Sequence, residues 1–504
     1  MTRLSQLLAG GSESRVRALR QRIGALADGL GIESAEAVSG SALSCESFLD
    51  GVLGANDKSR CWLVLSVLGA RFPVHADVER LHRAIYVGCR PAEAVLSTLD
   101  HIGVIDSDNL RRVEVSSGVL VDVDHTARYP LSTGIQRVVR EVVRRWTEVK
   151  DVTLVAWTFG FDGLRRLDAI EANRAVGDVE GDTLSLSRCD EGERPVIVPW
   201  HGRIIVPELF SEVARATASR AVFEFSQSQV GMVGFDCVPM TMSETTGEGM
   251  PVGFMHMLAA ARYVHRVAAI SDAAASEFRG WRSMLSSTGL LGPDVASVPL
   301  AVSTYNSTQN DVDHARGELG LGQLPIVLAV GSHEPRKNHM VVLHAAELLW
   351  RDGVRFALAF IGGHSWKADA FLRRVRELSQ QGLPVIVVER APEPLLWAAY
   401  RIATVSVSVS LQEGYGLPVA ESLACGTPVV TSNFGAMVEQ AVMGGCIQVD
   451  PRSPDAVARG IRSVLTDPSL RSKLSNEALR RPSRSWDQYA EELWTYLVDG
   501  VPPD

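Results

Sequence analysis

Apolar and polar residues recur with two different periods along the chain. In the first ~115 residues, the apolar positions of 15–30 and 78–99 follow the 3.6-residue period of a helix, with few β-branched runs. From residue 119 onward, short apolar runs rich in valine and isoleucine alternate with helical stretches. This alternation is the signature of a parallel sheet with crossover helices. The pattern therefore predicts a helical domain followed by α/β structure.

The predicted strands form two series that separate near residue 320. The first series comprises 119–123, 152–156, 203–206, 230–235 and 267–270, and the second comprises 326–330, 356–361, 385–388, 405–410 and 429–431. We expect two Rossmann-like doubly wound domains that face a cleft, with ligands at the carboxyl ends of the strands. The expected boundaries are a small helical domain over 1–115, the Rossmann-like domains over 116–305 and 306–480, and a closing helix over 481–504.

Composition and charge narrow the class of protein. The chain has 504 residues, is 46% hydrophobic and 22% charged, and carries a formal net charge of -9, which gives no general attraction to nucleic acid. Its seven cysteines show no CxxC or metal-ligand spacing and indicate reduced thiols. No signal peptide is evident, and the apolar stretches 62–70 and 254–261 are too short for a bilayer span. We expect a cytoplasmic protein, with peripheral contact at the inner membrane face left open.

The stretch 410–421 contains the most informative group of residues. Glu413, Gly414, Tyr415, Gly416 and Leu417 follow a predicted strand, Pro418 is placed for the first turn of a helix, and Glu421 lies within that helix. The two glycines allow the backbone to approach a ligand, and the amides of the new helix favour an anion. The alternative is an ordinary strand–turn–helix unit with solvated carboxylates.

A second stretch, 331–338, combines small residues with two adjacent cations. Gly331 and Ser332 follow a predicted strand, and Arg336 and Lys337 come just before a helix. Cations at a helix N-terminus oppose the helix dipole, unless an anion normally lies between them. The alternative is a solvated basic loop.

These two stretches together resemble the retaining glycosyltransferases of family four, which have the two-Rossmann-domain GT-B fold. The glutamates eight positions apart around a Gly-aromatic-Gly-Leu-Pro core carry the resemblance. It implies that Glu413 contacts hydroxyls of the donor sugar, that Glu421 holds the ribose, and that Arg336 and Lys337 bind the diphosphate. The second Rossmann-like domain would then bind the donor, through residues that also include Gly331, Ser332 and 414–417, and the first would face the acceptor.

The resemblance extends over residues 118–499 and is less specific in the first Rossmann-like domain. Residues 132–137 resemble the loop after the first strand of the family, which places Gly134 near the donor phosphate and the acceptor. Asp236 stands where relatives often have a His-Asp pair, but Phe235 replaces the histidine, which puts a contact of that histidine with the sugar in doubt. The closing helix would cross back over the first Rossmann-like domain.

The function implied is transfer of a sugar from a nucleotide-diphosphate sugar to a glycan or lipid-linked acceptor, with retention and without a metal or other cofactor. The amino-acid sequence of 334–338 resembles that of bacterial mannosyl- and rhamnosyltransferases of surface polysaccharides. This resemblance favours GDP-mannose or a deoxysugar nucleotide as the donor. Two alternatives stay open: a nucleotide-sugar epimerase or phosphorylase on the same frame, and a catalytically silent sugar-binding or scaffold protein. An NAD oxidoreductase is disfavoured, because no predicted strand is followed by G-x-G-x-x-G.

The helical domain lies outside the resemblance, and its role is open. Its apolar runs 61–65 and 84–87 need a surface to pack against. That surface is the first Rossmann-like domain, a second copy of the chain in a homo-oligomer, or a long acceptor that docks on the helical domain.

Overall fold

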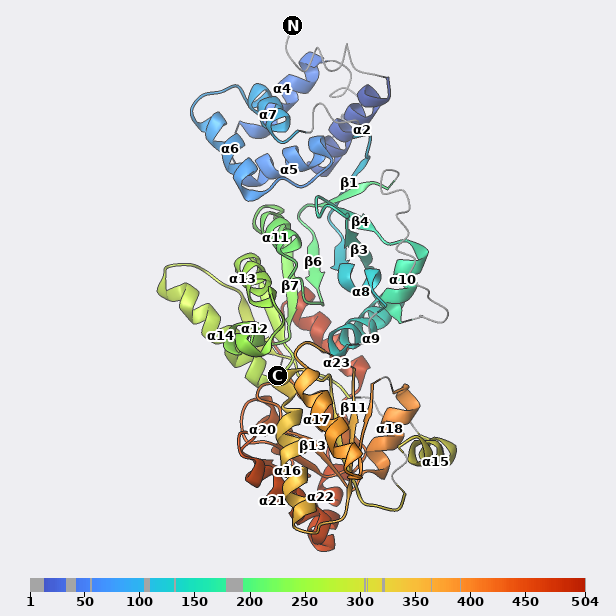
Figure 1. Cartoon of the computed structure of the whole chain (residues 1–504). Coiled ribbons are helices and arrows are strands. Elements are labelled where there is room, and N and C mark those ends of the chain that lie inside the picture. Colours follow the sequence, from blue (N-terminus) through green and yellow to red (C-terminus); the bar gives the residue numbers. More distant parts are fainter. Residues whose placement is uncertain are drawn as a thin grey trace.

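A computed structural model describes residues 13–32, 42–54, 57–103, 109–130, 133–177, 194–302, 305, 307–319, 322–363, 365–389 and 391–503. Three bodies follow one another along the long axis of the molecule: the helical domain, a first α/β domain and a second α/β domain (Figure 1). Among the described residues, no helix combines the length and the hydropathy that crossing a membrane requires.

The helical domain is built around one almost fully buried helix, α5. Its helices are α2 (Glu13–Gly29), α4 (Ala42–Leu53), α5 (Lys58–Gly69), α6 (His75–Tyr86) and α7 (Pro91–His101). The helical period expected over 78–99 is confirmed, but the chain breaks there into α6 and α7. Gly88, with φ of 96°, lies in the break, and Pro91 opens the new helix, as expected for residues that end and begin helices.

The helical domain and the first α/β domain share one hydrophobic core. The Phe72 ring lies 5.6 Å from Trp62 of α5 and 5.8 Å from Trp157 of the sheet, measured between centroids. The Phe72 amide also donates to the carbonyl of Asp162 at 2.6 Å. Arg22, buried in α2, donates to the carbonyls of Leu68, Asn109 and Arg111, which ties the helix to the connecting segment. The apolar run 61–65 is therefore buried inside the chain.

The first α/β domain contains, in the described residues, a nine-stranded sheet in the order β1-β5-β4-β3-β2-β6-β7-β8-β9. Its strands are β1 (Val113–Ser116), β2 (Val119–Asp122), β3 (Thr153–Trp157), β4 (Leu164–Arg166), β5 (Val196–Pro199), β6 (Arg203–Val206), β7 (Gln229–Gly234), β8 (Arg266–Ala269) and β9 (Asp294–Ser297). All pairs are parallel except those of β4, which runs antiparallel to both neighbours. The five predicted strands are present, whereas β1, β4, β5 and β9 were not predicted, and β1 spans the expected boundary at 115/116.

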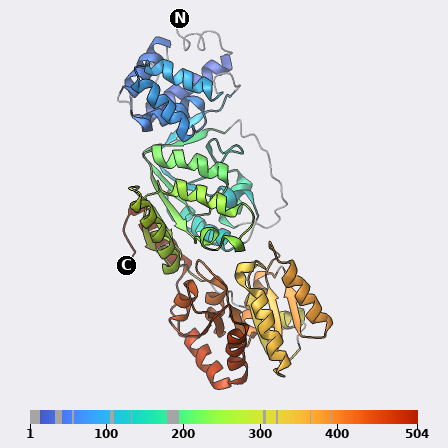
Figure 2. The same ribbon diagram turned by 60° about the vertical axis from the view of Figure 1, so that its left-hand side comes forward.

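Helices and short turns connect these strands and cover the sheet (Figure 2). They are α8 (Asp124–Arg128), α9 (Gly134–Val149), α10 (Ala169–Val176), α11 (Val213–Phe225), α12 (Val238–Thr241), η1 (Ser243–Thr245), α13 (Met250–Ala261) and α14 (Asp272–Ser287). Helix α9 buries one apolar face, formed by Val138, Val139, Val142, Val143 and Trp146.

The second α/β domain contains, in its described part, a six-stranded parallel sheet in the order β12-β11-β10-β13-β14-β15. Its strands are β10 (Ile326–Val330), β11 (Ala357–Ile361), β12 (Val385–Val388), β13 (Val405–Ser408), β14 (Val429–Ser432) and β15 (Cys446–Val449). Its helices are α15 (Gln309–Glu318), η2 (Pro335–Lys337), α16 (His339–Arg351), α17 (Asp369–Gln380), α18 (Glu393–Ile402), α19 (Leu417–Ala424), α20 (Ala436–Ala441), α21 (Pro454–Thr466) and α22 (Pro468–Leu479). The five predicted strands are present, and β15 was not predicted.

The end of the chain returns to the first α/β domain. Helix α23 (Trp486–Trp494) continues into a single π-helical turn, η3 (Thr495–Asp499). The indole of Trp146 in α9 donates to the carbonyl of Ala490 at 3.0 Å, and its ring lies 5.6 Å from that of Trp494. Leu497 packs closely on Gly231 of β7, because a Cβ added to Gly231 would lie only 3.0 Å from the Cβ of Leu497. The closing segment thus fastens the second domain to the first.

Candidate active site

Two loops meet at the carboxyl edge of the second sheet. Strands β10 and β13 pair in parallel at its centre, and the chain leaves them in opposite directions, to β11 on one side and β14 on the other. The segments 331–338 and 409–417 follow these two strands and so lie at the topological switch point, where doubly wound sheets bind ligands. Asn338 links them by donating to the carbonyls of Val409, at 3.1 Å, and Pro451, at 2.7 Å.

Glu413 lies buried between the two adjacent cations. Its carboxylate accepts from Arg336 at 2.7 Å and from Lys337 at 2.6 Å. Burial alone would raise the pKa of Glu413, but the two cations outweigh it and hold the pKa at about 2. The structure thus brings the segments 331–338 and 409–417 to one place, and the carboxylate of Glu413 is ionised there at any physiological pH.

Arg336 has further partners that the sequence did not indicate. Its guanidinium donates to Glu334 at 2.7 Å and to the carbonyl of Gln412 at 2.9 Å. An anion does lie between the two cations, but the chain itself supplies it: Glu413 contacts both cations, and Glu334 contacts Arg336. A diphosphate would enter a charge cluster that is already organised.

The small residues of these loops make close backbone approaches. Gly331, with φ of 142°, leaves room for the stem of Lys337, and a Cβ at Gly414 would lie 2.3 Å from the carbonyl oxygen of Phe235 in the first domain. Gly416, with φ of 90°, directly precedes α19 as its N-cap residue. We interpreted Gly414 as allowing approach to a ligand, whereas the approach seen is between the two domains. Ser332 donates to Glu334 at 3.1 Å.

Asp236 lies directly against this loop. A Cβ on Gly414 would lie 3.1 Å from its Oδ2. Burial raises the pKa of Asp236, while the charge of Arg336 opposes that shift. The structure thus brings Asp236, at the end of β7, to the same cluster as Arg336 and Glu413.

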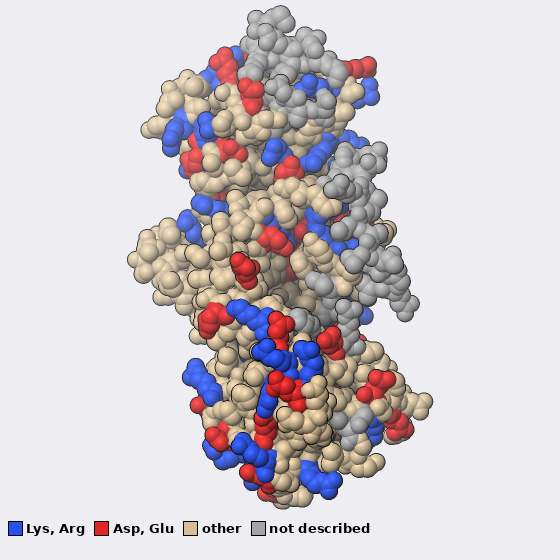
Figure 3. Space-filling view, viewed as in Figure 1, with Lys and Arg blue, Asp and Glu red and all other residues tan. Residues whose placement is uncertain are grey.

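The N-terminus of α14 holds the second domain against the first. Ser271 donates to the carbonyl of Gly414 at 2.5 Å, and Glu277 accepts from the side chain of Gln412. Glu439 of α20 accepts from the amide of Asp272 at 3.1 Å and from that of Ala273, and so caps α14 from the opposite domain. Figure 3 shows charged side chains of both signs gathered where the two α/β domains meet.

Glu421 lies in α19 at a second contact between the domains. It is buried, and its carboxylate accepts from Arg137 of α9 at 2.8 Å and from the hydroxyl of Tyr400 in α18 at 3.0 Å. Burial raises the pKa of Glu421, against the opposing effects of Arg137 and Tyr400. The sequence separates Arg137 and Glu421 by 284 residues, and no local pattern indicated this pair.

The remaining predicted residues lie around this second contact. A Cβ on Gly134 would lie 3.2 Å from Leu417, so the start of α9 faces the start of α19 across the domain boundary. The hydroxyl of Tyr415 donates to the carbonyl of Leu300 at 2.8 Å, and its ring packs on the first core. Residue 132, at the start of the stretch that contains Gly134, lies outside the described residues.

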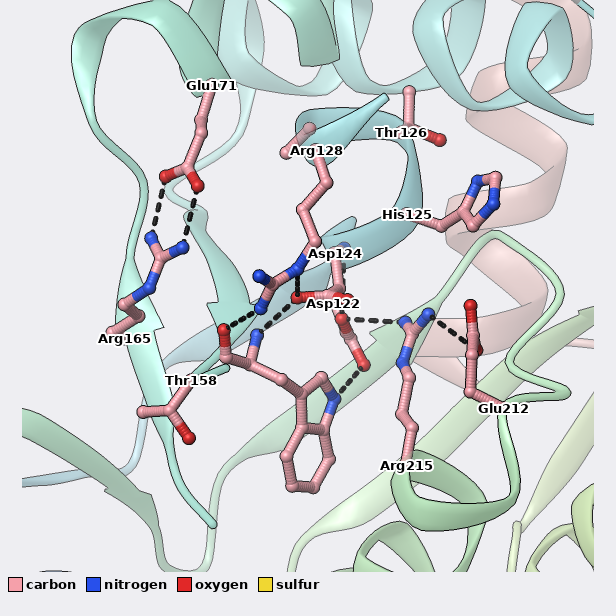
Figure 4. A network of polar contacts seen from close by, with 12 residues as sticks. Asp122, Asp124, His125, Thr126, Arg128, Thr158, Arg165, Glu171, Glu212 and Arg215 are labelled. Carbon is pink, nitrogen blue, oxygen red and sulfur yellow. Dashed lines mark hydrogen bonds and ion pairs between the residues drawn. The ribbon is translucent and has the colours of Figure 1, made fainter. Parts of the chain in front are cut away.

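A buried ionic network holds the loop between β2 and α9 (Figure 4). Arg215, fully buried, binds Asp122 at 2.9 Å and Glu208 at 2.8 Å. Glu208 accepts from the amides of His125, at 2.7 Å, and Thr126, at 3.0 Å, and thereby fixes the start of α8. Burial, with repulsion from Asp122, raises the pKa of Glu208 to about 7 despite Arg215. The network thereby positions α8, which follows β2 at the carboxyl edge of the first sheet.

Within the described parts of the chain, no group of three or more His, Cys, Asp or Glu side chains is arranged to hold a metal ion.

A family model of known proteins matches the region of the chain that contains the charged site. The family model for glycosyl transferases group 1 matches residues 311–481. That range contains Arg336, Lys337, Glu413 and Glu421, and leaves Gly134 and Asp236 outside.

Relatives and solved structures extend the similarity toward the first domain. The serotype-specific mannosyltransferase WbdA of Escherichia coli is 26% identical over 341 residues, which are 64% of this chain and 38% of WbdA. A D-inositol 3-phosphate glycosyltransferase of Acidothermus cellulolyticus is 34% identical over 223 residues, 42% of this chain and 49% of that protein. The chain thus spans less than half the length of these two relatives.

The crystal structure of HepE from Anabaena in complex with UDP-glucose has the same fold. It superposes with a TM-score of 0.54 and 13% identity, and covers 76% of this chain and 100% of that one. The two Rossmann-like domains facing each other are therefore confirmed as the GT-B fold.

Proposed function

We propose that the chain is a retaining glycosyltransferase of the glycosyl transferases group 1 family, whose model matches residues 311–481, and that it uses a nucleotide-diphosphate sugar. The observation that carries the proposal is the cluster of Arg336, Lys337 and Glu413 at the switch point of the second sheet, with Asp236 of the first domain against it. Cations fixed beside a carboxylate suit a donor that presents a diphosphate next to sugar hydroxyls.

In the proposed reaction, Arg336 and Lys337 stabilise the charge that builds on the departing diphosphate. The oxygen of the acceptor hydroxyl bonds to the anomeric carbon as the bond to the diphosphate oxygen breaks, on the same face of the sugar. The hydroxyl proton passes to a phosphate oxygen of the donor. Glu413 would meanwhile fix the sugar hydroxyls, and Glu421 the ribose diol.

We further propose GDP-mannose or a deoxysugar nucleotide as donor and a glycan or lipid-linked chain as acceptor. The E. coli relative matched over 64% of this chain is a mannosyltransferase, which supports mannose as the transferred sugar. The acceptor would bind at the wall formed by the first α/β domain, near Gly134 and Asp236.

The test is a panel of nucleotide sugars followed by product analysis. A true donor stabilises the folded chain by mass action, by about 2.7 kcal/mol at a hundredfold excess over its Kd, and so raises the melting temperature. We expect GDP-mannose or a deoxysugar nucleotide to do this more than UDP-glucose. Arg336→Met should abolish the shift, whereas Arg452→Met, an exposed control, should keep it. If no nucleotide sugar raises the melting temperature, the proposal is wrong.

We also propose that transfer needs no divalent metal ion, because Arg336 and Lys337 supply the positive charge. Turnover is expected to be unchanged by a chelator and by later addition of Mg²⁺ or Mn²⁺. Activity that disappears with EDTA and returns with either ion would contradict this.

NMR of the product should show the anomeric configuration of the donor.

A further inference from the structure

Arg137 connects the two walls of the site. It lies in the first turn of α9, three residues after Gly134, and its guanidinium reaches Glu421 of the second domain at 2.8 Å. The same guanidinium lies 6.0 Å from the centre of the Trp397 ring and 3.8 Å from Glu393, both in α18. Its side chain is 26% exposed, so it is held by these groups at the surface of the boundary between the domains.

The contacts of Glu421 leave part of the carboxylate available. Arg137 occupies Oε1 and the hydroxyl of Tyr400 occupies Oε2, with one hydrogen bond to each oxygen. An ionised carboxylate has about four lone-pair positions, so each oxygen has a further one for a hydroxyl. In hydrogen-bonding capacity, the carboxylate can therefore accept from a ribose diol while it keeps both partners.

We propose that Arg137 is a positioning residue: reaching across from the acceptor-side domain, it orients Glu421 and keeps it charged for the ribose of the donor. This inference rests on the proposed function. It deepens that function, because the donor site is complete only when α9 and α19 are together. Donor binding and the approach of the two domains then favour each other reciprocally.

The surroundings of Glu421 explain why the cation is needed. Burial raises the pKa of Glu421, and Arg137 is the first of the groups that lower it, followed by the hydroxyl of Tyr400. Glu393 of α18 raises the pKa, and Cys425 lies near on the chain after α19. Without Arg137 the pKa of Glu421 rises further, so its charged form is lost at a higher pH.

The test measures binding of GDP and UDP by calorimetry in the full chain. Arg137→Met should raise the Kd of the nucleotide about tenfold, because Glu421 loses one charged hydrogen bond. Arg137→Lys should restore part of the lost affinity. In Arg137→Met the loss of binding on acidification should begin at a higher pH than in the wild type. Arg144→Met, on the exposed face of the same helix, is the matched control and should bind like the wild type.

A double-mutant cycle with Glu421→Gln separates this role from others. If Arg137 acts through Glu421, Arg137→Met has no further effect once Glu421 is replaced. Equal losses in both backgrounds would show direct contact with the nucleotide, and tighter binding by Arg137→Met would show competition with the ribose; either result overturns the inference alone. Unchanged affinity and pH dependence in Arg137→Met would also overturn it. If the wild type binds neither nucleotide, the proposed function fails, and the inference fails with it.

Discussion

Glu413 is the residue in which charge, burial and the proposed chemistry meet. We expect Glu413→Gln to lower turnover about 10- to 100-fold, corresponding to ~1.4–2.7 kcal/mol, because the amide keeps the shape but loses the charge that orders both cations. The variant should remain folded but melt at a lower temperature than the wild type, since Arg336 and Lys337 lose a buried partner. Steady-state kinetics and thermal unfolding check both, with Glu148→Gln on the exposed face of α9 as control. Wild-type turnover would contradict the role given to Glu413.

The pH dependence of stability follows from the same residue. The pKa of Glu413 is about 2 in the folded chain, below its ordinary value of 4.5. Its ionised form therefore stabilises the fold fully above 4.5, and that contribution is lost as pH falls from 4.5 toward 2. We predict that the difference in unfolding free energy between wild type and Glu413→Gln shrinks over this window. Urea unfolding at several pH values measures it, and a constant difference would show that Glu413 does not titrate as described.

At the scale of elements, the helical domain and the first sheet form one packed unit. Phe72→Ala, between Trp62 and Trp157, should cost about 3–5 kcal/mol, as for large-to-small changes in cores. Calorimetry should show that the helical domain and the first sheet unfold in a single transition, and that in Phe72→Ala this whole transition moves to a lower temperature. Tyr86→Ala, where the ring is 77% exposed, is the control. A new transition that precedes an unshifted main one would mean that the helical domain unfolds by itself.

The packing of the helical domain also bears on whether the chain forms a homo-oligomer. The run 61–65 is buried within the chain, so it no longer argues for a second copy. The run 84–87 ends in Tyr86 and Val87, which are 77% and 70% exposed. A homo-oligomer through the helical domain stays a prediction.

At the scale of the whole molecule, α14 and α20 hold the two α/β domains together. Glu439 accepts two amide protons at the N-terminus of α14, an arrangement that typically contributes about 0.5–2 kcal/mol. Glu439→Ala should therefore favour separated domains, raise KM for the donor and increase the radius of gyration in small-angle scattering. Glu148→Ala serves as control. Identical scattering from Glu439→Ala and wild type would show that this contact does not hold the domains.

By itself, the sequence determined the local elements and the residues of the charged loops. Ten strands could be predicted, because a buried parallel strand is a short β-branched run bounded by turns, and that property needs no distant partner. The strands missed for lack of such a run include β4, which is three residues long and antiparallel. Arg336, Lys337, Glu413 and Glu421 were singled out from their residue types and their places between predicted strands and helices, together with the resemblance to the glycosyltransferases of family four.

Only the tertiary structure decided which group each charge meets. Ion pairing depends on distance in space, not on separation in the sequence. Arg336 and Lys337 pair with Glu413 instead of being solvated, and Glu421 is bound by Arg137, which lies 284 residues away in the sequence. Gly414 likewise has its neighbour in Phe235, because the two domains touch where each sheet ends. Local patterns carry no information on such contacts, since the fold of both domains must form before the partners lie within reach.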